Sequence, residues 1–231
     1  MAEILLKDGE RINQLFSTDV KIIQNREVFS YSVDSVLLSR FPNLPKRGLI
    51  VDLCAGNGAV GLFASTRTQA QIIAVEIQER LADMAQRSIE LNNLTSQMQV
   101  IQDDLKYLTR YISGSKVDMI LCNPPYFKVD EHSNLNASRH YLLARHEIAT
   151  NLEEICQISQ RVLKSNGRLT MVHRPERFLD IIETMTAHNL APKRIQFVYP
   201  KANRKANMLL IEAIKDGSRD GLKILPPLFI H

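Results

Sequence analysis

The sequence has no long apolar run, and this absence argues against a membrane-embedded protein. Nowhere in its 231 residues is there the stretch of roughly 18 apolar residues that a transmembrane helix requires. The N-terminal segment MAEILLKDGERINQLF carries acids and an asparagine where a secretory signal would have an unbroken apolar core. We therefore expect a soluble cytoplasmic protein with no membrane partner.

Cysteine is also scarce, and its spacing argues against a disulfide framework or a zinc cage. Cys54, Cys122 and Cys156 are an odd number, and no C-x-x-C pair occurs. Three free thiols suit a reducing compartment. Three histidines fall between residues 132 and 146, but no acid stands at a ligand spacing from them. We expect no metal site.

The net charge and the length of the chain exclude fewer classes of protein. The net charge of +4, with an isoelectric point near 9.0, permits a polyanionic partner without requiring one. A chain of 231 residues, 45% of them hydrophobic, suits one domain with at most a small appendage. The sequence has no internal repeat or linker. We expect a monomer or weak dimer.

Short apolar runs alternate with helical patterns from residue 48 onward, which is typical of a doubly wound, Rossmann-like α/β fold. The seven predicted strands are 48–53, 71–77, 98–104, 116–123, 167–173, 193–199 and 207–214. The last two are separated only by PKANRKA, which leaves no room for a crossover helix. The sequence predicts a seven-stranded, mostly parallel sheet with an antiparallel C-terminal edge hairpin.

Two regions stand outside this alternation. We interpret residues 1–47 as an N-terminal extension, a short hairpin followed by a helix from about Asp34 to Phe41, that packs on a ligand-binding domain formed by residues 48–231. Residues 126–149 form a long irregular stretch, and such loops are usually functional or disordered.

The segment VDLCAGNGAVGL follows the first predicted strand of the domain and opens a helix. Gly56, Gly58 and Gly61 match G-x-G-x-x-G, which lets the backbone approach a ligand at a helix N-terminus. Glu76 ends the next strand, where a carboxylate can accept hydrogen bonds from ribose hydroxyls. A dinucleotide-dependent oxidoreductase would show the same pattern.

Asp52 favours S-adenosylmethionine (SAM) over a dinucleotide. It lies at the carboxyl end of the strand, where it can meet the ammonium group of SAM directly or through water. A pyrophosphate has no comparable use for an anion. The predicted cofactor site therefore combines the glycine loop with the strand-end acids. Its members in this part of the chain are Asp52, Cys54, Gly56, Asn57, Gly58, Glu76 and Ile77.

Asp103 and Asp104 end the third strand of the domain and precede Leu105, and we predict that all three belong to the cofactor site. In this topology the position lies over the adenine edge of the cofactor, so one carboxylate can accept a hydrogen bond from the adenine amino group. We favour Asp104, because Asp103 can equally be a solvated turn residue. The alternative is a simple helix N-cap.

The segment ILCNPPYF leaves the fourth strand with an asparagine, two prolines and two aromatics. An exocyclic amino nitrogen on a planar ring is a poor nucleophile, because its lone pair is delocalised. Two acceptors aimed at its N–H bonds, the Asn123 side-chain oxygen and the Pro124 carbonyl, can direct that lone pair. The prolines hold the backbone still, and Tyr126 or Phe127 offers a stacking face. We predict Asn123, Pro124, Pro125 and Tyr126 as the catalytic group, with Asn123 also beside the cofactor.

With Asn-Pro-Pro-Tyr at this distance from a glycine loop, the sequence resembles class I SAM-dependent amino-methyltransferases. The segments GERINQLF and YPKANRKANMLLIEAIKDG resemble the bacterial enzymes that methylate N6 of adenine 37 in valine tRNA. The resemblance implies SAM as cofactor, S-adenosyl-L-homocysteine as product and the tRNA anticodon loop as partner. It also implies that FSYSVDS, residues 29–35, folds over SAM. Cys54 departs from the pattern, since such enzymes commonly have glycine there.

Basic residues suit an RNA substrate. Lys193, Arg194, Lys201, Arg204 and Lys205 lie on the predicted edge hairpin without an acid among them. The other interpretation is that these cations only protect a sheet edge. The predicted substrate-binding residues also include members of the proline motif and of the long loop. They are Tyr126, Phe127, Lys128, Arg139, Lys201, Arg204 and Lys205.

Four rival functions stay open. A glutamine-amide methyltransferase acting on release factors would share the NPPY motif, although such enzymes usually carry a separate N-terminal helical domain. A ribosomal-RNA guanine-N2 methyltransferase is a second rival. A SAM- or nucleotide-binding regulator has no use for Asn123 and Tyr126, and an NAD-dependent oxidoreductase would leave the proline motif unexplained.

Overall fold

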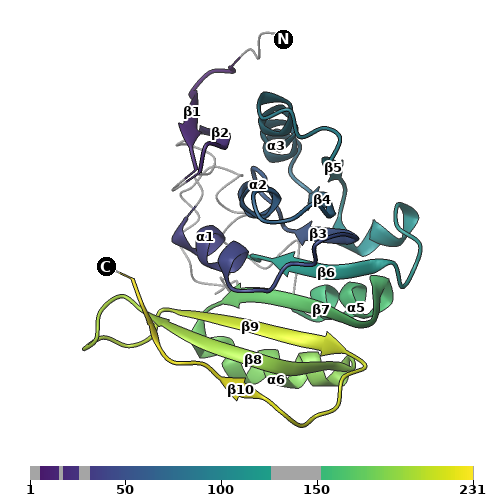
Figure 1. Ribbon diagram of the computed structural model, residues 1–231, viewed down its shortest axis with the longest axis vertical. Coiled ribbons are helices and arrows are strands. Elements are labelled where there is room, and N and C mark those ends of the chain that lie inside the picture. The colour runs from purple at the N-terminus through teal and green to yellow at the C-terminus, as the bar shows by residue number, and fades with distance from the viewer. Residues whose placement is uncertain (1–5, 16–17, 26–31, 126–151, 231) are drawn as a thin grey trace, which may run out of the picture.

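A single large sheet organises the chain. The computed structural model describes residues 6–15, 18–25, 32–125 and 152–230, and Figure 1 shows the sheet running from β5 at the top to β10 at the bottom. The strand order is β10-β8-β9-β7-β6-β3-β4-β5, with β11 beside β8. The strands are β3 (Leu49–Leu53), β4 (Gln71–Glu76), β5 (Met98–Gln102), β6 (Val117–Cys122), β7 (Leu163–His173), β8 (Leu190–Tyr199), β9 (Met208–Lys215), β10 (Lys223–Ile224) and β11 (Leu228–Phe229).

This topology confirms the predicted fold. All seven predicted strands form, and β3 to β7 pair in parallel. The strand β9 pairs antiparallel with both β7 and β8, which gives the expected C-terminal hairpin. Two strands of two residues each, β10 and β11, extend the sheet beyond β8. The order reverses between β3 and β6, and ligands of open α/β sheets bind at such a switch point.

Helices cover both faces of the sheet because its buried strands alternate between two cores. Ile50 and Leu121 face one core together with α1 (Val33–Arg40), α2 (Ala59–Ser65) and part of α3 (Glu79–Leu91). Val51 and Ile120 face the other core. The second set of helices is η1 (Leu105–Arg110), α5 (Leu152–Val162), η2 (Pro175–Arg177) and α6 (Phe178–Ala187).

The apolar stripe that follows Gln78 in the sequence is the buried face of α3. Leu81, Met84, Ala85 and Ile89 are all buried there. The apolar stripe of α5 ends at Val162, because Leu163 pairs with Val117 and begins β7. That strand pairing removes Leu163 from the helix.

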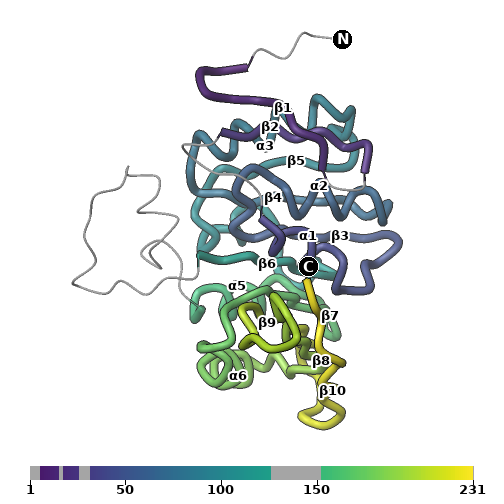
Figure 2. The backbone as a smooth tube through the Cα atoms, turned by 90° about the vertical axis from the view of Figure 1, so that its left-hand side faces the viewer, coloured from purple at the N-terminus to yellow at the C-terminus, as the bar shows by residue number. Residues whose placement is uncertain are grey.

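The N-terminal residues form a small separate sheet. β1 (Glu10–Gln14) and β2 (Lys21–Asn25) are an antiparallel hairpin, and α1 follows in the chain. β2 contacts α3, and Figure 2 shows the hairpin at the same end of the molecule as α3 and β5. The hairpin therefore lies against the half of the sheet that carries the glycine loop.

Candidate active site

The backbone of the glycine loop has conformations that favour glycine. Gly56 and Gly58 have φ of +56° and +82°, and Cys54 has φ of +56°. Left-handed backbone explains why glycine is usual at the position of Cys54. Cys54 lies beside Cys122, the last residue of β6, where burial raises the pKa of the Cys122 thiol and the neighbouring Cys54 thiol adds to the shift. This contact connects the loop after β3 to the strand that delivers the proline motif.

Asp52 lies under this loop and is fully buried. Its Oδ2 accepts a hydrogen bond from the Gly61 amide at 2.9 Å, and so caps α2 from a neighbouring strand. Glycine at position 61 also suits the packing, since a Cβ there would lie 2.5 Å from the terminal methyl of Met98. Burial raises the pKa of Asp52 to about 7, the Gly61 amide opposes that shift, and the negative charge of Glu76 adds to it.

Glu76 holds the loop from the adjacent strand. Its Oε2 accepts from the Gly56 amide at 2.8 Å, and its Oε1 accepts from the Gln78 amide at 2.9 Å. A carboxylate has about four acceptor sites, so two amides leave capacity for ribose hydroxyls. Burial raises the pKa of Glu76, while backbone hydrogen bonds oppose the shift. Ile77 follows with 42% of its surface exposed, an apolar face at the same edge.

The acids after β5 have partners within the chain. Asp104 is the N-cap of η1, since its Oδ1 accepts from the Lys106 amide at 3.1 Å. Its Oδ2 also pairs with the Lys106 Nζ at 2.7 Å. Asp103 accepts from the Tyr111 hydroxyl at 2.8 Å. The N-cap is therefore present, and the adenine contact assigned to one of the two acids stays a prediction. Leu105 is buried beneath them.

The proline motif begins at the carboxyl end of β6, beside β3. Pro124 is buried, whereas Asn123 and Pro125 are half-buried. The parallel strands β3, β4, β5 and β6 thus bring the glycine loop, the strand-end acids and this motif to one edge of the sheet. Four predicted site residues lie outside the described part of the chain: Tyr126, Phe127, Lys128 and Arg139.

The basic residues divide between two ends of β8. Lys201, Arg204 and Lys205 are exposed in the loop after β8. Because β7 and β8 both run antiparallel to β9, this loop lies on the same edge as the proline motif.

Lys193 and Arg194 lie near the start of β8, toward the opposite edge. The Lys193 Nζ donates to the backbone carbonyls of Ser218 and Asp220. The Arg194 guanidinium lies 4.6 Å from the Phe41 ring and 3.4 Å from Glu212. The expectation that five cations act together was therefore wrong for these two, because both serve the packing of the sheet edge.

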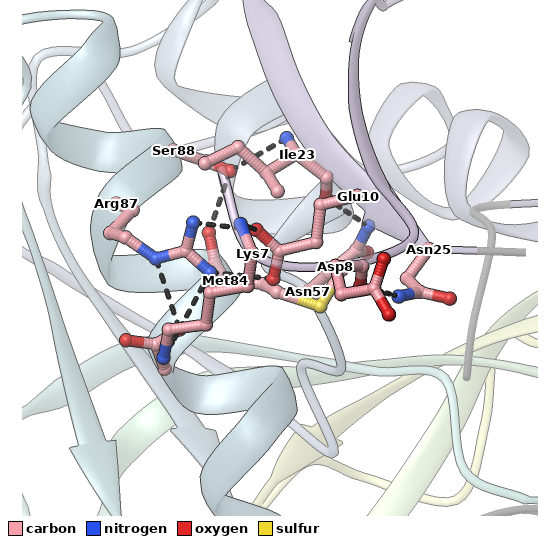
Figure 3. Close-up of polar contacts among 10 residues, drawn as sticks. Lys7, Asp8, Glu10, Ile23, Asn25, Asn57, Met84, Arg87 and Ser88 are labelled. Carbon is pink, nitrogen blue, oxygen red and sulfur yellow. Dashed lines mark hydrogen bonds and ion pairs between the residues drawn. The ribbon is translucent and has the colours of Figure 1, made fainter. Parts of the chain in front are cut away.

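One contact of the glycine loop has no signature in the sequence. The Asn57 side chain is fully buried, and its Nδ2 donates to the Ile23 carbonyl of β2 at 3.1 Å. The Ile23 amide donates to Ser88 Oγ of α3 at 2.9 Å (Figure 3). The Asn57 Oδ1 is buried and, within the described residues, has no hydrogen-bond partner. The hairpin is therefore bonded to the loop itself.

Metal-ligand clusters and membrane-spanning helices are both lacking among the described residues. Over those ranges, no group of three histidines, cysteines or acids is placed to hold a metal ion. No described helix is long and apolar enough to cross a membrane.

Comparison with known proteins identifies the family. A profile of the methyltransferase small domain matches residues 19–190. The chain belongs to this methyltransferase family. The match confirms the predicted enzyme class, a methyltransferase that uses SAM, and it covers the hairpin strand β2 as well as the glycine loop and the proline motif.

Relatives of this methyltransferase carry a more specific name. A Photobacterium profundum protein named tRNA1(Val) (adenine(37)-N6)-methyltransferase is 26% identical over 184 residues, which span 78% of this chain and 75% of that protein. A Bacteroides fragilis protein of the same name is 28% identical over 79% of this chain and 82% of its own length. For a Shewanella relative of that name, 29% identical, the matched part is 61% of this chain and 58% of the relative.

Solved structures share the fold. A predicted O-methyltransferase from Agrobacterium tumefaciens superposes with a TM-score of 0.68 at 24% identity, over 86% of this chain and 88% of that one. A geranyl diphosphate methyltransferase bound to its substrate and sinefungin gives a TM-score of 0.60 at 12% identity, over 79% and 78% of the two chains. At these sequence identities the similarity shows a shared fold and nothing more specific.

Proposed function

We propose that this methyltransferase transfers a methyl group from SAM to the exocyclic N6 of an adenine in tRNA, with adenine 37 of valine tRNA as the target. The observation that carries the proposal is the position of Asn123 and Pro124 at the end of β6, beside the glycine loop that follows β3. The shared name of the relatives from Photobacterium and Bacteroides supports the choice of adenine and tRNA.

The residues at the strand ends fit SAM. Two buried oxygens, Asp52 Oδ1 and Asn57 Oδ1, have no hydrogen-bond partner within the described residues, and buried polar atoms normally have one. A ligand with an ammonium group and hydroxyls can satisfy such acceptors. We assign Asp52 to the ammonium side, Glu76 to the ribose, and Ile77 with Asp104 and Leu105 to the adenine. Bound SAM supplies an activated methyl group, so the protein needs to supply only position and polarity.

The chemistry of the protein is preorganised hydrogen bonding. The Asn123 side-chain oxygen and the Pro124 carbonyl accept hydrogen bonds from the two N–H groups of the target nitrogen. The adjacent prolines keep both acceptors fixed. Holding the nitrogen in line with the methyl group provides the proximity effect. Tyr126 or Phe127 stacks on the base. Bound SAM would supply the methyl group, and the two acceptors would hold the nitrogen that takes it from the sulfur and releases one proton to water.

The substrate assignment rests on charge and accessibility. Lys201, Arg204 and Lys205 face phosphates at the catalytic edge, with Lys128 and Arg139 adding to the field. A base in an anticodon loop is cheaper to splay out than one in a duplex. We also propose a cytoplasmic monomer or weak dimer, with residues 1–47 as an extension on a catalytic domain of residues 48–231.

The product nucleoside tests the proposal. The protein is incubated with methyl-labelled SAM and unmodified bulk tRNA, and the tRNA is digested and analysed. Label in N6-methyladenosine is the expected result, and transcripts of single tRNAs with adenine 37 replaced then locate the base. Label in methylguanosine, or only in a protein fraction that contains release factors, would instead identify one of the two rival methyltransferases.

A further inference from the structure

An aromatic pair lies beside the basic loop at the catalytic edge. Tyr199 ends β8, and Phe229 lies in the C-terminal strand β11, which pairs in parallel with β8 so that the two residues are neighbours. Their ring centroids are 5.7 Å apart with an interplanar angle of 41°. The Ile230 amide donates to the Tyr199 carbonyl at 3.0 Å, which fixes the strand next to the ring.

Core packing does not account for Phe229. Leu228 and Ile230 flank it and pack against the core cluster formed with α1 and α2, so they attach the C-terminal strand to the sheet. Side chains alternate along a strand, so Phe229 points to the other side. It keeps 40% of its surface exposed. An exposed aromatic ring at a sheet edge is available to a partner.

The charges around the pair favour one kind of partner. Tyr199 is followed directly by the loop that carries Lys201, Arg204 and Lys205, all exposed. Within the described residues, none of these cations forms an ion pair, in contrast to Arg177 and Lys164, which pair with acids. Aromatic rings combined with unpaired cations are typical of surfaces that bind single-stranded nucleic acid, where bases stack and phosphates are neutralised.

We propose that Tyr199, Phe229 and the loop of residues 200–207 form a binding surface for unpaired nucleotides of the RNA that flank the methylated base. The inference rests on the proposed function. β8 lies three strands from β6 and β11 lies one strand further, which places Tyr199 about 14 Å and Phe229 about 19 Å from the proline motif. In this arrangement the C-terminal strand contributes to substrate binding as well as closing the sheet.

Replacing Phe229 tests the surface. Phe229→Leu keeps an apolar side chain on β11 but removes the ring face, so it separates stacking from strand packing. We expect Phe229→Leu and Phe229→Ala each to weaken binding of an anticodon stem-loop RNA by about fivefold or more. Phe229→Tyr retains the ring and should bind as the parent does. Ile224→Ala, at an exposed position of β10, is the control.

Binding is measured by fluorescence anisotropy and needs no methyl transfer, so its outcome is independent of the nucleoside assay. With active enzyme, the same variants should raise the KM for tRNA and leave kcat and SAM affinity unchanged. Parent-like RNA binding by a folded Phe229→Leu variant would overturn the inference while leaving the proposed function intact. A parent that binds the RNA but labels no adenosine would overturn the proposed function alone.

Discussion

At the scale of single residues, Asp52 is a carboxyl group removed from water at the centre of the candidate site. Its carboxyl group is fully buried and its pKa is raised to about 7, because burial disfavours the charged form more than the Gly61 amide favours it. Below pH 7 the free protein therefore holds a proton on Asp52. A cationic ligand beside this carboxylate favours the ionised form, so binding of SAM should release that proton.

The release of this proton makes SAM affinity depend on pH. SAM affinity should rise with pH, by up to about tenfold per unit, as pH approaches 7 from below, and should level off above 7. Calorimetry in two buffers of different ionisation enthalpy measures the released proton. Asp52→Asn cannot titrate, so its affinity should be lower and lack this component of the pH dependence. A parent-like slope in Asp52→Asn would assign the titration to Glu76 or to SAM itself.

Substitution of Asn123 should affect the rate of methyl transfer but not the affinity for SAM. Asn123→Ala removes an acceptor that acts on the target nitrogen, so we expect kcat to fall by about 100-fold or more while SAM affinity stays near that of the parent. Asn123→Asp retains an oxygen at the same position and should keep more activity. Single-turnover methylation and calorimetry of SAM binding measure the two quantities. Loss of SAM binding in Asn123→Ala would place Asn123 in the cofactor pocket instead.

At the scale of elements, the β1–β2 hairpin depends on a partly buried ion pair. Arg87 of α3 donates to both carboxylate oxygens of Glu10, at 2.8 and 2.7 Å, and its guanidinium also pairs with Asp83 (Figure 3). The Glu10 side chain has no exposed surface in this pair. Removing one partner of such a pair leaves an uncompensated charge.

Arg87→Met should therefore loosen the hairpin, at a cost of about 3 kcal/mol. Hydrogen exchange should become faster first at the Ile23 amide, which donates to Ser88 Oγ. Thermal unfolding should begin at a lower temperature. Lys7→Met is the matched control, because Lys7 bonds the same acid, Asp83, from a side chain that is 58% exposed. An exposed pair contributes about 0–1 kcal/mol. Equal effects of the two changes would exclude the Glu10 pair as the anchor.

Elements also show what the sequence could predict. The strands β3, β4 and β6 are buried on both faces and read as continuous apolar runs, so their positions follow from local pattern. The glycine loop was predictable for the same reason, since its spacing reflects local backbone geometry. β10 and β11 have two residues each and form only because β8 offers an open edge. No local pattern specifies such a pairing.

Contacts between distant segments were equally hidden. The Asn92 side-chain amide bonds both the amide and the carbonyl of Lys21, and Asn57 bonds Ile23. An asparagine in a helix end or a loop carries no mark of its partner strand. The division of the basic residues between two ends of β8 was missed because it depends on strand direction relative to β9. The sequence was sufficient to place the glycine loop, the acids and the proline motif at strand ends, whereas their side-chain partners required coordinates.

At the scale of the whole molecule, charge position should matter more than net charge for RNA binding. Lys201→Glu with Arg204→Glu removes two cations at the catalytic edge. Arg219→Glu with Lys223→Glu makes the same change in net charge at exposed positions near the opposite edge. If phosphates lie on the loop of residues 200–207, only the first pair removes phosphate contacts.

The salt dependence of RNA binding distinguishes these two double variants. Each lost phosphate contact lowers the slope of log K against log salt by about 0.7–0.9, so Lys201→Glu/Arg204→Glu should flatten it by roughly 1.5 units and weaken binding at low salt. Arg219→Glu/Lys223→Glu should keep a parent-like slope, with a smaller uniform loss from long-range field. Anisotropy titrations between 50 and 200 mM salt, about the range over which such contacts change affinity most clearly, measure both. Identical slopes in the two variants would mean that the cations of the loop act only through net charge.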